Sequence, residues 1–72
     1  MATTVGRNIR RIRKRSGYSQ ARLAALARTS QSWISRLETA DENPTIGSMT
    51  RIAQALRVEV MDLLQDATEG VA

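Results

Sequence analysis

Five side chains suited to contacts with DNA bases lie within six consecutive positions near the middle of the chain. They are Gln31, Ser32, Trp33, Ser35 and Arg36. Amide and guanidinium groups form paired hydrogen bonds with base edges, which are most distinctive in the major groove of DNA. A short helix supported from behind fits into that groove, which is about 12 Å wide. The segment therefore indicates a surface that reads double-stranded DNA.

Two short amphipathic patterns would position this surface. Ser19 is a suitable N-cap for a helix near residues 20 to 27, and Ser30 is one for a helix near residues 31 to 38. The inward positions of both helices are apolar: Leu23, Ala24, Ala27, Ile34 and Leu37. Only Arg28 to Ser30 remain for the connection. We therefore expect a steep crossing, with the small Ala24 at the closest approach.

An ordinary helical hairpin with solvated outer faces is the alternative interpretation of this stretch. The distribution of charge favours the DNA-reading one. Residues 1–38 carry nine Lys and Arg against one acid, whereas residues 39–72 carry two against six. The positive charge is therefore concentrated in the half that contains the candidate reading helix, as contacts with phosphates require.

Composition excludes several other classes of function. The 72 residues suffice for one small domain, and they include neither Cys nor His. Disulfides, thiolate zinc sites and most general-base chemistry are thereby ruled out. No apolar run approaches the roughly 20 residues needed to cross a membrane. The N-terminal region does not resemble a signal peptide, because no apolar block follows the basic segment Arg7 to Arg15. We expect a cytoplasmic protein that is not an enzyme and has no cofactor, metal or membrane partner.

The remaining pattern predicts an all-α, compact five-helix bundle. A first helix is expected over residues 4–15, followed by a left-handed stop at Gly17. A fourth is expected over Ile46 to Leu56, after a cap at Thr45, and a short one within residues 58–64. The expected inward positions of the first and fourth helices are Val5, Ile9, Ile12, Met49, Ile52, Ala53 and Leu56. One domain over residues 1–65 would precede a flexible tail at 66–72.

From Val5 to Leu64, the chain resembles the phage-repressor and Cro family of helix-turn-helix regulators, also called the xenobiotic-response-element (XRE) family. The segments that carry the resemblance are IRRIRKRSGYSQ, LAALARTSQSWISRLE, ENPTIGSM, RIAQAL and VEVMDLL. The resemblance implies a lambda-repressor-like DNA-binding domain.

The resemblance also implies roles for residues at the start of both helices of the motif. Ser19 and Gln20 match positions that contact a phosphate, which suits the positive end of a helix dipole. Ser30 caps the reading helix and is included in the expected DNA-binding set. Gln31 and Ser32 match base-reading positions, and a Gln amide suits adenine. As the alternative, Gln31 is only a polar residue of a first helical turn.

Further along the reading helix, the resemblance places Arg36 within reach of guanine or a phosphate, flanked by Trp33 and Ser35. The alternatives are a solvated Arg36 and a Trp33 half-buried in the core. Arg13 and Glu38 match a family ion pair. The basic residues of the first helix are expected to spread around it, with one or two near phosphate: Arg10, Arg11, Lys14 and Arg15.

Four residues depart from the family pattern. Arg28 and Arg57 stand where the family usually has Gly, so left-handed dihedrals there would each cost about 1 kcal/mol. Asp41 and Glu42 stand in a loop that often carries Gly and Lys near the DNA backbone. Either this loop points away from the phosphates or DNA binding is weakened.

These patterns together predict a sequence-specific transcriptional regulator, a dimeric repressor that reads a near-palindromic operator through major grooves about 34 Å apart. Dimerisation is expected through residues 58–64, where Val60, Met61 and Leu64 provide apolar surface; the alternative is that these residues are plain core. A competing function is an antitoxin-like protein-interaction module with secondary DNA binding. A membrane-surface role for the first helix is disfavoured because it has no aromatic anchor.

Overall fold

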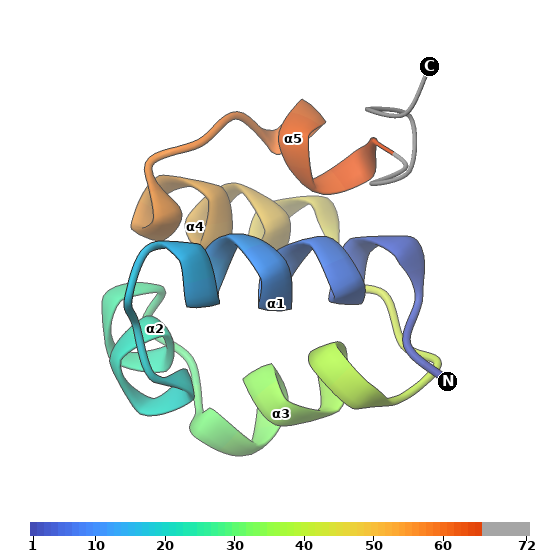
Figure 1. The fold of residues 1–72 in the computed structure, drawn as a ribbon, viewed down its shortest axis with the longest axis horizontal. Coiled ribbons are helices and arrows are strands. Elements are labelled where there is room, and N and C mark those ends of the chain that lie inside the picture. Colours follow the sequence, from blue (N-terminus) through green and yellow to red (C-terminus); the bar gives the residue numbers. More distant parts are fainter. Residues whose placement is uncertain (66–72) are drawn as a thin grey trace.

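Five helices make up the described part of the chain, residues 1–65, in the computed structural model (Figure 1). They are α1 (Thr4–Arg15), α2 (Gln20–Leu26), α3 (Gln31–Thr39), α4 (Ile46–Leu56) and α5 (Val60–Leu64). No strand occurs among these residues. The all-α five-helix expectation is therefore confirmed, whereas the tail expected at residues 66–72 lies outside the described residues.

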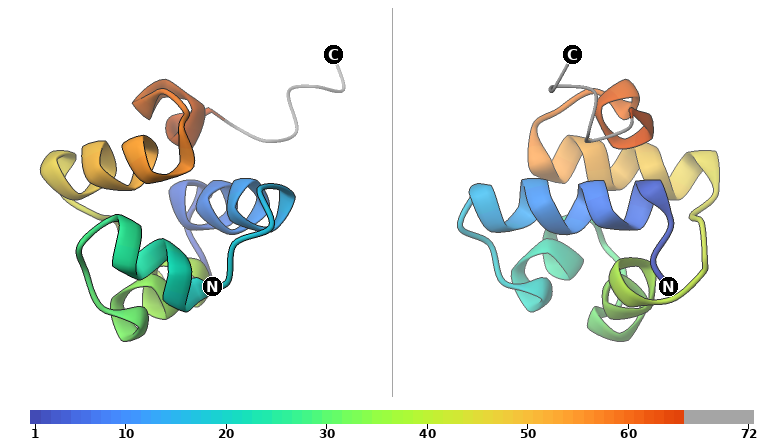
Figure 2. Two further views of the ribbon diagram at one scale, coloured as in Figure 1. Left: turned by 90° about the vertical axis from the view of Figure 1, so that its left-hand side faces the viewer. Right: turned by 45° about the vertical axis from the view of Figure 1, so that its right-hand side comes forward.

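The long helix α1 crosses the middle of the view in Figure 1, and in Figure 2 (left) it lies on the opposite side of the molecule from α4. In Figure 1, α3 lies on one side of it, α4 and α5 lie on the other, and α2 stands at its C-terminal end. No helix of residues 1–65 is long and apolar enough to cross a membrane.

The apolar positions expected to face inward form one core. Ile9, Leu23, Ile34 and Leu37 have no exposed surface, and Ala24 is 3% exposed. The other buried apolar residues are Val5, Ile12, Ala27, Met49, Ile52, Ala53, Leu56 and Leu63. The periodic pattern of apolar residues thus placed the core correctly in the first four helices.

Side-chain caps begin four of the helices. The hydroxyl groups of Ser19, Ser30 and Thr45 each accept a hydrogen bond from the backbone N–H three residues later, at 3.0, 3.1 and 3.1 Å. Thr3 does the same for α1 at 3.0 Å. The three caps expected from the sequence are confirmed, and Gly17 has the left-handed φ of +80° expected of a stop.

Two non-glycine residues, Arg28 and Arg57, adopt the left-handed conformation, with φ of 58° and 59°. Each follows a helix in which a carbonyl of the last turn accepts the same type of backbone hydrogen bond. Beyond Arg28, the N–H of Thr29 donates to the carbonyl of Ala24 at 2.9 Å, and beyond Arg57 that of Val58 donates to Ala53 at 2.9 Å. Both turns therefore keep the geometry of glycine-ended helices although arginine occupies them.

Helix boundaries differ from expectation at three places. α2 ends at Leu26, one residue early, and α3 continues to Thr39, one residue late. Val58 closes α4 and so lies outside α5, which begins at Val60. The start of α5 is set by Glu59, whose N–H donates to the Asp62 carboxylate at 2.9 Å.

Two buried residues of α1 fix its neighbours. Asn8 has no exposed surface, and its amide donates to the carbonyl of Leu63 at 2.9 Å and to that of Gln65. This amide satisfies carbonyls at the end of α5 that have no partner within the helix. A Cβ on Gly6 would collide with the carbonyl oxygen of Leu37, so only glycine lets α1 approach the backbone of α3 this closely.

Candidate nucleic-acid interface

The outer side of α3 presents Gln31, Ser32 and Arg36 as exposed side chains. Ile34 and Leu37, on the opposite side, have 0% exposure and anchor the helix in the core. Rotation of α3 about its axis would bring these apolar side chains into water, at a cost of about 1.5–3 kcal/mol each. The orientation of the three polar side chains is therefore set by the core beneath them.

Trp33 and Arg36 act as a pair on this surface. Trp33 is half-buried against the core, and the Arg36 guanidinium carbon lies 5.0 Å from the centre of its ring. The Nε atom of Arg36 is also 3.8 Å from Oε1 of Glu42. Arg36 is thus held between an aromatic face and a carboxylate, so the acidic loop reaches the reading helix.

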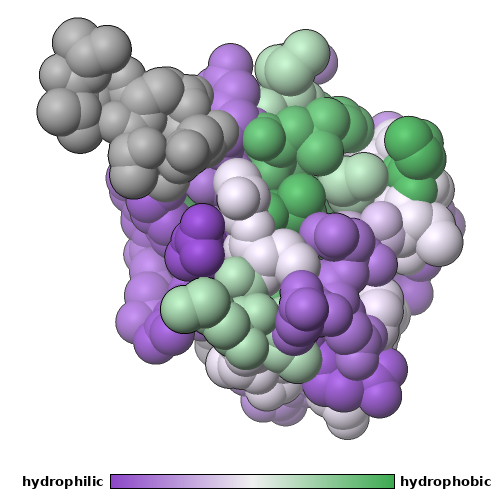
Figure 3. Space-filling model, turned by 90° about the vertical axis from the view of Figure 1, so that its right-hand side faces the viewer, coloured by the Kyte–Doolittle hydropathy of each residue, from purple (hydrophilic) through white to green (hydrophobic). Residues whose placement is uncertain are grey.

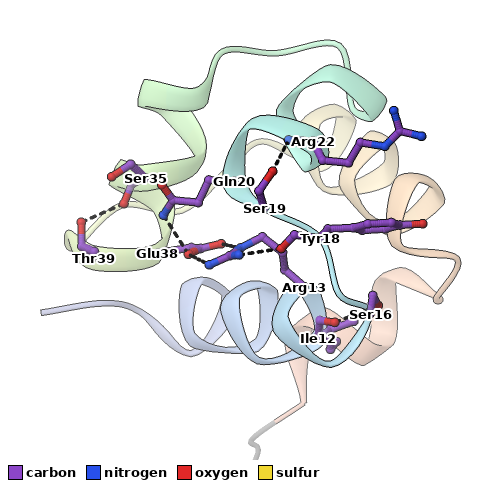
Figure 4. A network of polar contacts seen from close by, with 10 residues as sticks. All are labelled: Ile12, Arg13, Ser16, Tyr18, Ser19, Gln20, Arg22, Ser35, Glu38 and Thr39. Atoms are coloured by element: carbon purple, nitrogen blue, oxygen red, sulfur yellow. Dashed lines mark hydrogen bonds and ion pairs between the residues drawn. The ribbon is translucent and has the colours of Figure 1, made fainter.

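Ser35, the remaining expected contact on α3, is half-buried. Its carbonyl accepts a hydrogen bond from the Thr39 hydroxyl at 2.8 Å (Figure 4). Ser35 is therefore less accessible than Gln31, Ser32 or Arg36.

The capping serines retain hydrogen-bonding capacity. Ser19 and Ser30 are exposed, and each uses an oxygen lone pair to accept a backbone N–H. A hydroxyl keeps its own O–H donor when it accepts in this way. Both side chains therefore remain able to donate to a phosphate oxygen.

Glu38 is the centre of a buried polar network (Figure 4). Its Oε2 accepts from Nε of Arg13 at 2.7 Å, and its Oε1 accepts from Nη2 of Arg13 at 2.9 Å and from Nε2 of Gln20 at 3.1 Å. Nη1 of Arg13 donates to the carbonyl of Tyr18 at 2.8 Å. The ion pair expected between α1 and α3 is present, and it also binds the start of α2.

The environment of Arg13 keeps it charged. Its hydrogen bonds to Glu38 raise the pKa of the Arg13 guanidinium above its usual value; desolvation opposes this shift and the charge of Glu38 adds to it. Arg13 and Glu38 are only 8% and 3% exposed. Because removal of one partner would leave the other charge buried and unpaired, the pair fixes the relative placement of α1 and α3.

Four cations of α1 line a single groove beside the end of α3, which we call the α1–α3 groove. It has a volume of about 560 Å³ and is lined by Arg7, Arg10, Arg11, Lys14, Glu38, Thr39 and Ala2. The expectation that the basic residues spread around α1 missed this grouping. Spacings of three, four and seven residues place the four cations on one side of a helix, and this signal was present in the sequence.

The α1–α3 groove adjoins the start of α2 through Glu38, which lines the groove and also binds Gln20. Within residues 1–65, no group of three or more His, Cys, Asp or Glu side chains is arranged to hold a metal ion. The site is thus a set of hydrogen-bond donors and cations on α1, α2 and α3.

The helix-turn-helix domain family matches residues 4–65. An uncharacterised HTH-type transcriptional regulator, y4dJ, from Sinorhizobium fredii is 35% identical over 69 residues, covering 96% of this chain and 90% of that protein. The HTH-type transcriptional regulator SlrR of Bacillus subtilis is 35% identical over 65 residues, covering 89% of this chain but 43% of its own length.

A solved structure shows the same arrangement of helices. The crystal structure of SinR, a master regulator of biofilm formation, in complex with DNA has a TM-score of 0.80 and 34% identity, covering 85% of this chain and 98% of that one. The chain therefore spans nearly all of some relatives and less than half of others.

Proposed function

This chain belongs to the helix-turn-helix family of phage-repressor and XRE type, and from that premise we propose that it is a sequence-specific regulator of transcription that binds double-stranded DNA. α3 enters the major groove, where Gln31, Ser32 and Arg36 contact base edges. Ser19 and Gln20 contact the phosphate backbone from the start of α2. Such a regulator acts in the cytoplasm on the nucleoid, and it performs no catalysis.

One observation supports this function above the others: the polar side chains of α3 are exposed while Ile34 and Leu37 behind them are fully buried. If α2 and α3 were an ordinary helical hairpin with solvated outer faces, we would not expect its polar residues to lie beside a groove lined by four cations. Here the α1–α3 groove and the reading helix meet at Glu38 and Thr39. Base-contacting and phosphate-contacting groups therefore occupy one continuous part of the surface.

We also propose that the protein is a homodimer through residues 58–64 and represses transcription from a near-palindromic operator. Met61 and Leu64 are 60% and 47% exposed, while Leu63 between them is fully buried. Figure 3 shows apolar surface gathered beside the C-terminal end of the described chain. Two copies related by a two-fold axis would present reading helices to major grooves about 34 Å apart.

Selection of bound duplexes from a random pool tests the function directly. We expect a consensus with two related half-sites, bound about a thousandfold more tightly than a scrambled duplex at the same salt concentration. Arg36→Gln should lose most of this preference. Arg15→Gln removes the same charge from a residue that lies neither on α3 nor in the α1–α3 groove, and this variant should keep the preference. A pool that yields no consensus would contradict the proposal.

The same apolar surface also supports a second candidate, an interaction module that holds a different protein. Sedimentation of the purified chain separates the two possibilities. A homodimer that dissociates on Met61→Glu supports the first. A monomer that captures a protein partner and loses it on the same substitution, with no preference among duplexes, supports the second.

A further inference from the structure

A second basic hollow lies between α2 and α4, on a side of the molecule to which α3 contributes no lining residue. We call it the α2–α4 hollow. Its volume is about 360 Å³, and its polar lining consists of Tyr18, Arg22, Arg28, Arg51, Gln54 and Arg57. None of the lining residues is acidic. Figure 2 (left) shows α2 and α4 next to each other on this side, and in Figure 4 the side chains of Tyr18 and Arg22 extend away from the Glu38 network.

Two of the four arginines have unfavourable backbone conformations. Arg28 and Arg57 are the only non-glycine residues with positive φ within residues 1–65, and both line this one hollow. Glycine or asparagine occupies such helix-ending positions without comparable strain. The two turns belong to different helices, so one local sequence effect does not account for both. Residues in strained conformations are concentrated at binding sites, where function maintains them.

Stabilisation of helix ends accounts for only part of this positive charge. The C-terminal ends of α2 and α4 both meet the hollow, and each carries about half a negative charge. Four guanidinium groups exceed that by about three charges. Within residues 1–65, no carboxylate lies within 4.0 Å of any of the four, because the only ion pairs there join Arg13 to Glu38 and Arg36 to Glu42. Within the part of the chain that the structure describes, the hollow therefore has no carboxylate paired with its four arginines.

Within residues 1–65, Arg51 is the one arginine of the four whose guanidinium donates hydrogen bonds to other residues. Its Nε donates to the carbonyl of Ala27 at 3.1 Å, and its Nη2 lies 3.5 Å from the hydroxyl of Ser48. These bonds hold the guanidinium of the half-buried Arg51 next to the turn that carries Arg28. Its Nη1 has no acceptor among the described residues, so this donor remains available.

We propose that the α2–α4 hollow binds a compact phosphate-bearing anion with several charges, of the pyrophosphate or nucleotide-polyphosphate class. Guanidinium groups bind phosphate oxygens in a bidentate manner, and several of them together favour adjacent phosphates over a single carboxylate. The volume of 360 Å³ is within the range of small-molecule sites and too small for a folded partner. None of the residues that line this site is among those proposed to contact DNA, although Tyr18 and Arg22 flank Ser19 and Gln20 in the sequence.

Inorganic pyrophosphate is the probe that tests this site. Calorimetry and thermal denaturation at low ionic strength should show binding and a raised Tm, compared with sodium chloride of equal ionic strength. The Arg28→Gly/Arg57→Gly variant should have a higher Tm than the wild-type chain without ligand, because strain is relieved. It should bind pyrophosphate at least tenfold more weakly, because the variant lacks two charge-assisted hydrogen-bond donors. Weaker binding by this variant is therefore not a failure to fold.

The other basic surface provides the matched control. Arg10→Gln/Lys14→Gln removes the same number of charges from the α1–α3 groove and should leave pyrophosphate binding within twofold. Three results would overturn the proposal: no binding beyond the chloride effect, undiminished binding by the double-glycine variant, or an equal decrease in the groove variant.

A DNA titration distinguishes a free anion from the phosphates of a duplex. For a free ligand, the double-glycine variant should bind DNA with the same dependence on salt as the wild-type chain. A weaker, less salt-dependent DNA affinity would assign the hollow to the duplex backbone and overturn the proposal. Since the pyrophosphate titration contains no DNA, its outcome does not depend on the proposed regulatory function.

Discussion

Glu38 connects three helices through side-chain atoms alone. It accepts two hydrogen bonds from Arg13 and one from Gln20, at 2.7, 2.9 and 3.1 Å. The Gln20 amide nitrogen carries two hydrogens, and Glu38 uses one of them. The second is therefore held in a defined direction at the start of α2. This geometry supports the proposed phosphate contact of Gln20, because the side chain is ordered before DNA arrives.

Two glutamines are expected to contribute in different ways to DNA binding. Gln31→Ala should relax discrimination between bases at one position. A good pair of hydrogen bonds contributes about 1–3 kcal/mol to that discrimination. Gln20→Ala should instead weaken binding to all duplexes alike, because a phosphate carries no sequence information. Titrations with the selected operator and with single-base variants measure both effects. Equal profiles for the two variants would contradict the division of roles.

Glu42 is expected to lower DNA affinity by competing for Arg36. Its carboxylate lies 3.8 Å from Arg36 Nε on a partly exposed surface, where such pairs contribute at most about 1 kcal/mol. Glu42→Gln should therefore raise affinity for duplex DNA by up to about fivefold. Asp41→Asn is the matched control, because it makes the same change of charge in an exposed neighbour. If both variants bind equally tightly, only net charge matters and Arg36 is not restrained by Glu42.

At the scale of elements, Ala24 of α2 is 3% exposed, and we expect its small side chain to be what permits the close crossing of α2 and α3. Ala24→Leu should destabilise the domain by about 1–3 kcal/mol through overpacking. For a domain of 60–100 residues, each kcal/mol lowers Tm by about 4–8 °C. Thermal denaturation should show this decrease, and Ala21→Leu, on the exposed side of the same helix, should show little change. A Tm for Ala24→Leu equal to that of the wild-type chain would mean that a larger side chain fits between α2 and α3.

The short helix α5 is held in place by Asn8. The fully buried amide donates to carbonyl oxygens of Leu63 and Gln65. Asn8→Asp keeps the size but replaces a donor with an acceptor facing those oxygens, so we expect the free energy of unfolding to fall by about 3 kcal/mol. Urea denaturation measures it, with the exposed Asn43→Asp as control. Similar stabilities for the two variants would show that α5 is held by its apolar contacts alone.

Periodicity predicted α1 and α4 to the residue, because their apolar positions repeat regularly and their starts carry hydroxyl caps. It misplaced the start of α5 because Val58 looks like a helix residue yet closes the preceding turn. No pattern in the sequence indicated the structural roles of Asn8 and Gly6. Their importance depends on the carbonyls of Leu63 and Leu37, which are distant in sequence.

For the candidate site, the sequence predicted which side chains of α3 are exposed but not two of the contacts between side chains of different elements. Gln31, Ser32 and Arg36 were placed on an exposed face because their apolar neighbours Ile34 and Leu37 defined the opposite one. The hydrogen bond between Gln20 and Glu38 was not predicted, since it joins side chains from two helices whose crossing angle a sequence does not specify. The ion pair between Glu42 and Arg36 was also missed. Whether these two side chains meet depends on the path of the loop that carries Glu42, which the sequence does not specify.

At the scale of the whole molecule, eight of the 11 Lys and Arg residues line two basic surfaces, four on each. The α1–α3 groove meets the reading helix at Glu38 and Thr39, whereas the α2–α4 hollow receives no residue from α3. DNA bound against α3 should therefore neutralise cations of the groove. Those of the hollow should remain outside the interface. The net charge of +4 describes neither surface, because Glu38 is the one acidic residue that lines the groove and no acidic residue lines the hollow.

Salt dependence of DNA binding tests this division. Removing one cation that neutralises a phosphate reduces the slope of log K against log salt by about 0.9. Lys14→Gln, in the groove, should lower the affinity for all duplexes and reduce the slope by about one. Arg15→Gln removes the same charge from the next position, outside the groove, so its slope should remain that of the wild-type chain. Equal slopes for the two variants would mean that α1 contributes only general positive charge, and that the phosphates lie along α2 and α3 alone.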